Sequence, residues 1–185
     1  MQNSATKIYT YKLPILSFCA YASNSGKTTL ITQLIPALIA RGLRISVIKH
    51  AHHRFDIDYS EKDSYKLREA GAVQTMIASN TRWALMTEHR NTLNSAPEPN
   101  LKSLLAQLDT TLADLVLVEG FRHEAIPKVE IFRASLGQPL LAAEDSTIIA
   151  VASDAPLATH LPVLDLNNIE QIADFVMQFA LQSNS

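Results

Sequence analysis

Short apolar runs recur along the chain and predict the strands of a mostly parallel sheet. The runs at 115–118 and 147–152 are continuous, as in strands that are covered on both faces. Two further runs, at 14–20 and 44–49, enclose segment 28–41, which we predict to be an amphipathic helix. Its apolar face comprises Leu30, Ile31, Leu34, Ile35, Leu38 and Ile39. A strand, a helix and a second strand after about 25 residues have the spacing of a right-handed βαβ crossover.

The remaining segments are shorter and are separated by loops. They predict helices at 63–70, 100–108 and 169–180, a β-hairpin made of strands 73–78 and 83–87, short strands at 129–132 and 163–164, and a mixed loop at 134–146. The strand at 129–132 alternates apolar and polar residues, so we expect it to lie nearer an edge of the sheet. No internal repeat or linker is evident, which predicts one domain over 1–185 with flexible tails at 1–12 and 182–185.

A loop of small residues joins the first predicted strand to the first predicted helix. Its residues are Ser23, Asn24, Ser25, Gly26, Lys27, Thr28 and Thr29. A strand, such a loop, Gly-Lys-Thr and a helix, in this order, form a phosphate-binding P-loop. Backbone N–H groups and the helix dipole would bind the phosphates, Lys27 would reach the β- and γ-phosphates, and the Thr28 hydroxyl would ligate Mg²⁺. The pattern therefore predicts a nucleoside triphosphate site.

One residue departs from the P-loop pattern, because Tyr21 stands five residues before Gly26, where the full pattern has glycine. Tyrosine adopts a left-handed conformation only at a cost, so we expect an unusual exit from the strand. The alternative is a Ser/Asn turn before an ordinary helix capped by Asn24 or Ser25. The flanking strand and helix favour the phosphate site. We therefore expect an α/β fold, a P-loop NTPase-like three-layer sandwich with a mostly parallel central sheet and a β-hairpin extension.

A P-loop site also requires an acidic group for Mg²⁺ or its water shell. Glu119 closes an apolar strand at its carboxyl end, the sheet edge at which the P-loop also opens. Asp114 begins the same strand and would lie ~15 Å away at the opposite edge. This geometry favours Glu119, directly or through water. A solvated glutamate before a glycine turn is the alternative.

Asp154 is the candidate for reading the base. Guanine presents N1–H and N2–H donors side by side, and one carboxylate can accept a hydrogen bond from each. An aspartate at the end of a core strand suits this task. Asp154 also precedes Ala-Pro, so a turn cap is the alternative interpretation.

A histidine cluster follows the second predicted strand and comprises His50, His52 and His53. A metal site would need further ligands, and no spaced cysteine or carboxylate clearly completes one. His50 and His52 could instead act as a switch near the γ-phosphate or contact a second anionic ligand. A structural function is the third alternative.

The composition is that of an ordinary globular protein. The 185 residues are 47% hydrophobic and 18% charged, and the formal net charge of −2 predicts no nucleic-acid or membrane partner. Cys19 is the one cysteine, and its place in the first strand favours a buried, inert thiol. The first residues have no apolar signal core, and no apolar run reaches the ~18 residues that span a bilayer. We expect a cytoplasmic location.

Several segments together resemble the molybdopterin-guanine dinucleotide biosynthesis adaptor protein B (MobB) family. They are Ser-Asn-Ser-Gly-Lys-Thr-Thr-Leu at 23–30, Ile-Lys-His-Ala-His-His at 48–53, Lys-Asp-Ser at 62–64, Leu-Arg-Glu-Ala-Gly-Ala at 67–72, Arg-Trp-Ala-Leu-Met at 82–86, Leu-Val-Leu-Val-Glu-Gly-Phe at 115–121 and Ala-Val-Ala-Ser-Asp at 150–154. The P-loop alone is unspecific, but its combination with the histidine segment and the Val-Glu-Gly-Phe segment is highly specific.

The resemblance implies a GTP-binding homodimer that assists the last step of molybdenum-cofactor maturation, in which GMP is joined to molybdopterin. The nucleotidyl transfer would belong to a MobA-type guanylyltransferase, and a molybdenum-insertion protein is a further implied partner. The family is at most a weak GTPase. Carried over to this sequence, Gly26, Lys27 and Thr28 bind phosphate and Mg²⁺, and Glu119 and Asp154 take the functions given above.

The resemblance also implies a dimer built through β-strands. The hairpin at 73–87 or the strand at 129–132 would then be the pairing edge. Two other functions remain open. A small-molecule kinase or ATP-dependent ligase would need a lid that carries arginines, and no arginine-rich segment is evident. A scaffold with a relic P-loop is favoured only by Tyr21.

Overall fold

The computed structural model describes residues 11–22, 24–51, 55–89 and 98–183. They form two compact units. The first comprises the described residues of Met1–His50 and Asn100–Ser185, and the second those of Ala51–Pro99. No helix in these described ranges is long and apolar enough to cross a membrane.

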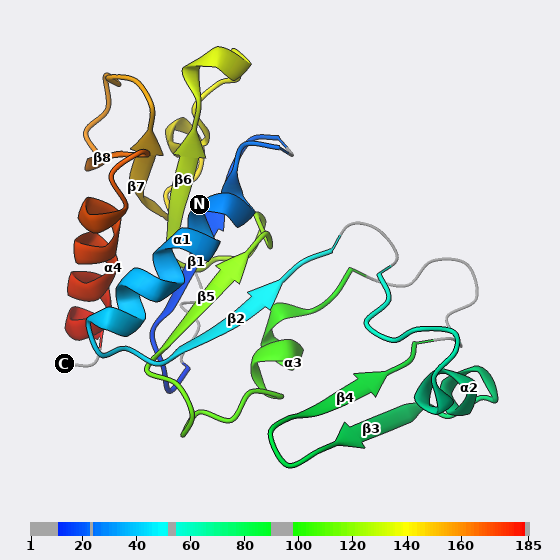
Figure 1. Cartoon of the computed structure of the whole chain (residues 1–185). Helices are drawn as coiled ribbons and strands as arrows, with labels where there is room; N and C mark the ends of the chain where they lie inside the picture. Colours follow the sequence, from blue (N-terminus) through cyan, green and yellow to red (C-terminus); the bar gives the residue numbers. More distant parts are fainter. Residues whose placement is uncertain (1–10, 23, 52–54, 90–97, 184–185) are drawn as a thin grey trace, which may run out of the picture. The chain divides into compact units, whose positions relative to one another are not determined.

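The first unit contains a six-stranded parallel sheet in the order β2-β5-β1-β6-β7-β8 (Figure 1). Its strands are β1 (Ile15–Cys19), β2 (Ile45–Lys49), β5 (Leu115–Glu119), β6 (Lys128–Phe132), β7 (Ile148–Ser153) and β8 (Val163–Asp165). The mostly parallel α/β fold expected from the apolar runs is confirmed. Since β1 and β2 both pair with β5, with Phe18 and Lys49 each opposite Glu119, their carboxyl ends lie at the same edge.

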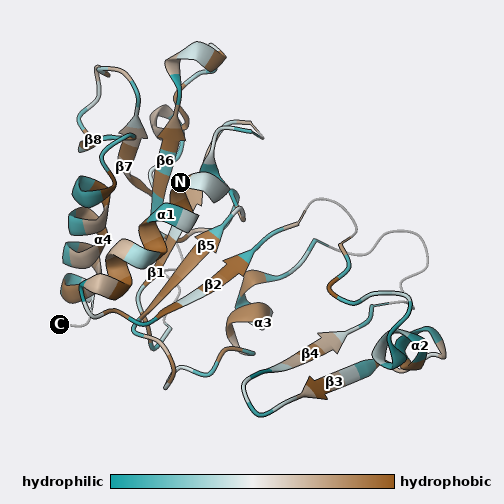
Figure 2. Cartoon of the chain, in the orientation of Figure 1, coloured by the Kyte–Doolittle hydropathy of each residue, from teal (hydrophilic) through white to brown (hydrophobic). Residues whose placement is uncertain are grey.

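Helices cover both faces of this sheet (Figure 1). They are α1 (Lys27–Ala40) and α4 (Ile169–Ser183) on one face and α3 (Leu101–Leu105) on the other. Buried apolar residues of α1 and α4 form one core cluster with the strands, and both helices carry apolar and polar residues in turn (Figure 2). Leu30, Leu34 and Leu38 are buried as predicted, but Ile39 is 57% exposed, so the apolar face of α1 is narrower than expected.

Asparagine side chains cap the starts of two of the helices. The Asn100 side chain accepts a hydrogen bond from the Ser103 N–H at the start of α3. The Asn168 side chain accepts one from the Gln171 N–H at the start of α4. Each cap satisfies a donor in the first turn, which has no partner within its helix.

Strand β6 lies in the interior of the sheet, between β1 and β7. The prediction that residues 129–132 lie nearer an edge is therefore wrong, and this strand cannot be the pairing edge of a dimer. The error comes from the polar residues Lys128 and Glu130, which suggested a solvated face but are each only 1% exposed. Their partners come from the segment 134–147.

Two hydrogen bonds to each side chain satisfy the buried charges of β6. The ammonium group of Lys128 donates to the Asp145 carboxylate at 3.1 Å and to the Thr147 hydroxyl. The Glu130 carboxylate accepts hydrogen bonds from the N–H groups of Leu141 and Ala142, each at 2.8 Å. A buried charge is tolerated when it is paired and hydrogen-bonded in this way.

The second unit contains helix α2 (Asp63–Glu69) and an antiparallel hairpin of β3 (Gln74–Ala78) and β4 (Trp83–Thr87). The predictions for this helix and hairpin are confirmed. Arg68 is the central side chain, 9% exposed. Its guanidinium donates to Asp56 at 2.7 Å and to Glu88 at 3.1 Å. It thereby joins the helix to the segments on both sides of the hairpin.

Candidate functional site

The described part of the predicted P-loop lies between β1 and α1. Ser23 lies outside the described residues. Asn24 and Gly26 have left-handed backbone conformations, with φ of 63° and 90°. Gly26 is the N-cap residue of α1, so the alternative in which Asn24 or Ser25 caps the helix is wrong. The Ser25 hydroxyl instead donates to the main-chain oxygen of Ala22 at 3.2 Å, which closes the loop on itself.

Tyr21 is accommodated without backbone strain. Among the described residues other than glycine, only Asn24 and Phe121 have a positive φ. The left-handed residues of the loop are therefore Asn24 and Gly26, and Tyr21 is not one of them. Tyr21 is 43% exposed, and the Arg122 guanidinium lies over its ring at 5.4 Å from the centroid. The absence of glycine at this position is thus compatible with the rest of the loop.

The Lys27 side chain folds back over the loop. Its ammonium group donates to the main-chain oxygen of Ala22 at 3.1 Å and to the Ser25 hydroxyl at 3.3 Å. Burial lowers the pKa of Lys27, and the charge of Glu119 opposes this shift. A half-buried ammonium held over a loop of this type is in place to meet an anionic ligand.

Thr28 and Glu119 are in direct contact. The Thr28 hydroxyl donates to Glu119 Oε1 at 2.7 Å, across 91 positions of sequence. Lys49, at the end of β2, contacts the same two oxygens, with Nζ 3.0 Å from each. A hydroxyl and a carboxylate oxygen at the end of the loop are the donor types that Mg²⁺ prefers. The residues present therefore fit a magnesium ion, which Thr28 would ligate directly and Glu119 directly or through water.

Asp114 lies at the other end of β5 and is engaged elsewhere. Its carboxylate accepts hydrogen bonds from the backbone and the guanidinium of Arg44, at 2.7 to 3.0 Å. These bonds lower the pKa of Asp114 to about 2. Asp114 therefore joins the start of β5 to the start of β2, at the edge of the sheet opposite the P-loop. This is the position that the strand geometry predicts.

Asp154 follows β7 and makes two contacts. One carboxylate oxygen accepts a hydrogen bond from the Ala134 N–H at 2.9 Å, and the other lies 3.5 Å from Nη1 of Arg133. The first contact is a long-range cap of the short 3-10 turn at Ala134–Leu136, whereas the alternative interpretation placed the cap at the Ala-Pro turn that follows Asp154. The side chain remains 23% exposed, so the cap leaves part of the carboxylate open to a ligand.

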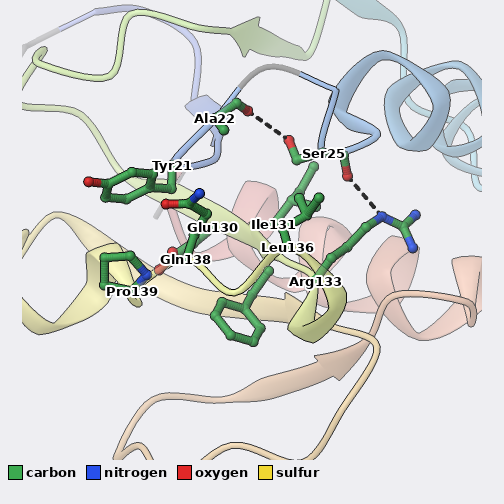
Figure 3. Close-up of a pocket in the computed structure, with 10 residues that line it drawn as sticks. Tyr21, Ala22, Ser25, Glu130, Ile131, Arg133, Leu136, Gln138 and Pro139 are labelled. Carbon is green, nitrogen blue, oxygen red and sulfur yellow. Dashed lines mark hydrogen bonds between the residues drawn. The ribbon is translucent and has the colours of Figure 1, made fainter.

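Arg133 is a component of the site that the sequence did not indicate. Its Nε donates to the main-chain oxygen of Ser25 at 3.0 Å (Figure 3). A Cβ atom at Gly26 would lie 3.2 Å from Nη2 of the same guanidinium. This arginine lies against the P-loop and lines a pocket at its mouth. The other residues that line the pocket are Tyr21, Ala22, Ser25, Glu130, Ile131, Phe132, Leu136, Gln138 and Pro139.

His50 packs beside the loop that follows Glu119. Its N–H donates to the main-chain oxygen of Glu119 at 2.9 Å, and its ring stacks on Phe121 with centroids 4.9 Å apart. A Cβ atom at Gly120 would lie 2.8 Å from the His50 Cβ, so this close approach requires glycine. His52 and His53 lie outside the described residues. Within the described ranges, no three His, Cys, Asp or Glu side chains are grouped to hold a metal.

Comparisons with known proteins point to one family. The family model described as "Molybdopterin guanine dinucleotide synthesis protein B" matches residues 15–154. The molybdopterin-guanine dinucleotide biosynthesis adapter protein of Escherichia coli (strain K12) is 49% identical over 173 residues, which cover 93% of this chain and 96% of that protein. The adapter protein of the same name from Haemophilus influenzae is 47% identical and is covered to 88% of its length.

A solved structure extends this similarity to the fold. The crystal structure of molybdopterin-guanine biosynthesis protein B superposes with a TM-score of 0.69 and 27% sequence identity. The match covers 90% of this chain and 99% of that chain. The solved structure therefore shares the fold, and the residues that the family model matches include the P-loop, Glu119 and Asp154.

Proposed function

The chain belongs to the family of molybdopterin guanine dinucleotide synthesis protein B, and we propose that it binds GTP with Mg²⁺ and assists a guanylyltransferase that joins GMP to molybdopterin. A function in molybdenum-cofactor biosynthesis follows from the family, whose curated relatives are named adapter proteins. The nucleotide, the metal and the partner belong to the proposal. The alternative of a small-molecule kinase or ATP-dependent ligase is not favoured by these relatives.

The contact between Thr28 and Glu119 carries the nucleotide proposal. The hydroxyl is in the first turn of α1 and the carboxylate closes β5, so their 2.7 Å contact places an acid beside the phosphate loop. In this arrangement Gly26, Lys27 and the N–H groups of the first turn would hold the phosphates. Thr28 and Glu119 would hold Mg²⁺, which neutralises the charge on the phosphate oxygens.

Asp154 supports the choice of GTP over ATP. It follows β7, two strands from β1, at the same sheet edge as the phosphate loop. Its partly exposed carboxylate can accept the N1–H and N2–H donors of guanine, whereas adenine presents a bare N1 acceptor beside its amino group. We propose that the protein binds GTP as part of its adapter function, hydrolyses it weakly at most, and acts in the cytoplasm.

A second copy of the chain is the partner that the hairpin fits best. In the β3–β4 register Met76 lies opposite Leu85 and Ala78 lies opposite Trp83, so these side chains share one face. Met76 and Trp83 are each 62% exposed and Leu85 is 39% exposed. Because β6 is enclosed, the hairpin is the proposed pairing edge of a homodimer. The guanylyltransferase and a molybdenum-insertion protein are the other proposed partners.

Isothermal titration calorimetry with GTP, ATP and XTP tests the base assignment. Xanthine carries an oxygen where guanine carries the 2-amino group, so the amide of an Asp154→Asn variant suits xanthine and the native carboxylate suits guanine. We expect wild type to prefer GTP over ATP by about tenfold or more, and the variant to prefer XTP over GTP. Asp63→Asn, an exposed carboxylate in α2, is the matched control. Equal affinities of wild type for ATP and GTP would refute guanine recognition.

Lys27→Ala tests the phosphate loop separately from the base. The loss of the ammonium group removes a cation that lies over the loop, and we expect GTP affinity to fall by about tenfold or more. The proposal fails if this variant binds GTP as tightly as the wild type does. Circular dichroism checks that the variant keeps the helix content of the wild type.

A further inference from the structure

Lys49 closes a three-way contact with the two residues that would hold the metal. Thr28 Oγ1 and Glu119 Oε1 lie 2.7 Å apart, and Lys49 Nζ is 3.0 Å from both oxygens. The contact is built into the sheet, because Lys49 is directly opposite Glu119 in the β2–β5 register. The same two oxygens that suit Mg²⁺ therefore share a cation supplied by the chain itself.

The low exposure of Glu119 explains why a cation is needed beside its carboxylate. The carboxylate side chain is only 11% exposed, whereas the Lys49 side chain is 50% exposed and can move. A largely buried carboxylate beside bound phosphates repels them unless a cation lies between the two charges. The ammonium group of Lys27 is directed instead to the Ala22 main-chain oxygen and the Ser25 hydroxyl.

We propose that Lys49 is an internal counter-ion, which holds the place of Mg²⁺ between Thr28 and Glu119 and leaves it when the metal–nucleotide complex binds. This inference rests on the proposed nucleotide site. It has two consequences. The Lys49 charge allows nucleotide to bind without metal, because it neutralises Glu119. The same charge opposes the binding of a divalent cation alone, because the cation must displace the ammonium group from both oxygens.

The alternative is a cross-strand ion pair that only joins β2 to β5. An ion pair of this kind contributes to stability and leaves metal binding unchanged. Since the two possibilities differ in how metal and nucleotide affinities are coupled, they can be separated by binding measurements. Stability alone does not separate them.

The first measurement compares GTP dissociation constants in excess EDTA and in saturating Mg²⁺. We expect Lys49→Met to weaken metal-free binding by about tenfold, because a unit charge a few ångströms from Glu119 is lost. Binding with Mg²⁺ should change by less than about threefold, because the ion then neutralises the carboxylate. Lys49→Arg, which keeps the charge, should restore metal-free binding. Lys102→Met, at an exposed position of α3, is the matched control.

The second measurement needs no nucleotide and uses Mn²⁺ as the probe, with free ion followed by electron paramagnetic resonance. Lys49→Met should bind Mn²⁺ at least about fivefold more tightly than wild type, and adding Glu119→Gln should abolish the gain. Equal Mn²⁺ affinities of wild type and Lys49→Met would overturn the counter-ion function. If wild type binds no nucleotide, the proposed GTP site fails, and the Mn²⁺ measurement still decides the function of Lys49.

Discussion

Arg133 donates a hydrogen bond from Nε to the main-chain oxygen of Ser25, so a side chain from the end of β6 supports the phosphate loop at 3.0 Å. The same guanidinium lies 3.5 Å from the carboxylate of Asp154. One residue thus connects the loop that would hold phosphates with the acid that would read the base. A nucleotide that contacts both the phosphate loop and Asp154 would therefore bind to two elements that Arg133 already connects.

We expect Arg133→Ala to weaken GTP binding by about fivefold to tenfold, because the loop loses a hydrogen bond from a charged donor. The GTP affinity of Arg133→Lys should fall between those of Arg133→Ala and wild type, since one ammonium group cannot reproduce the forked geometry of a guanidinium. Calorimetry gives the dissociation constants, and thermal unfolding checks that the fold is retained. An unchanged affinity of the alanine variant would show that the contact does not support ligand binding.

The ion pair between Asp114 and Arg44 should make stability depend on pH. Hydrogen bonds from Arg44 lower the pKa of Asp114 to about 2, below its value in the unfolded chain. A lowered pKa contributes stability that is present above about pH 4 and is lost as the pH falls toward 2. After allowance for solvent screening, we expect Asp114→Asn to cost roughly 1 kcal/mol at neutral pH and clearly less near pH 3.

Urea unfolding of wild type and Asp114→Asn at several pH values measures this difference. The free energies of unfolding of the two proteins should converge as the pH falls. A difference that stays constant between pH 7 and pH 3 would contradict the assignment, because a neutral asparagine cannot titrate.

Local patterns predicted most elements of this fold. Periodicity and turn residues predict α1, the hairpin and the apolar strands β5 and β7. These signals are local, because the residues that produce each of them are near neighbours in the sequence. Glu119 was also accessible from sequence, because the end of a parallel strand defines which edge of the sheet a residue lies at. Its contact with Thr28 follows from that rule and the position of the P-loop.

The interior position of β6 could not be predicted in this way. Lys128 and Glu130 alternate with apolar residues as on a solvated face, and their partners lie in a later loop that has no regular pattern. Arg133 was missed for a related reason. Its acceptor is a main-chain oxygen at Ser25, 108 positions away, and backbone acceptors leave no trace in a sequence.

A charge placed on the exposed apolar face of the hairpin should change the oligomeric state of the protein. Trp83→Glu places a charge among apolar side chains that we propose to be covered by a second copy, so the homodimer should dissociate into monomers. Since Trp83 is 62% exposed within one chain, its replacement should leave the monomer folded. Sedimentation velocity measures the mass, with Leu112→Glu, an exposed position of the first unit, as control. A dimer that survives Trp83→Glu would exclude this face as the interface.

Cys19 should be chemically inert in the folded protein. Burial is the larger cause that raises the pKa of Cys19 to about 12, and the nearby negative charge of Glu130 is the second. At pH 8 only about one thiol in ten thousand would be ionised, and the thiolate is the reactive form. Iodoacetamide should therefore leave Cys19 unmodified in buffer and alkylate it in urea, as mass spectrometry can show. In a Lys102→Cys variant the exposed thiol should react while Cys19 does not, and equal labelling of both sites would contradict the buried position of Cys19.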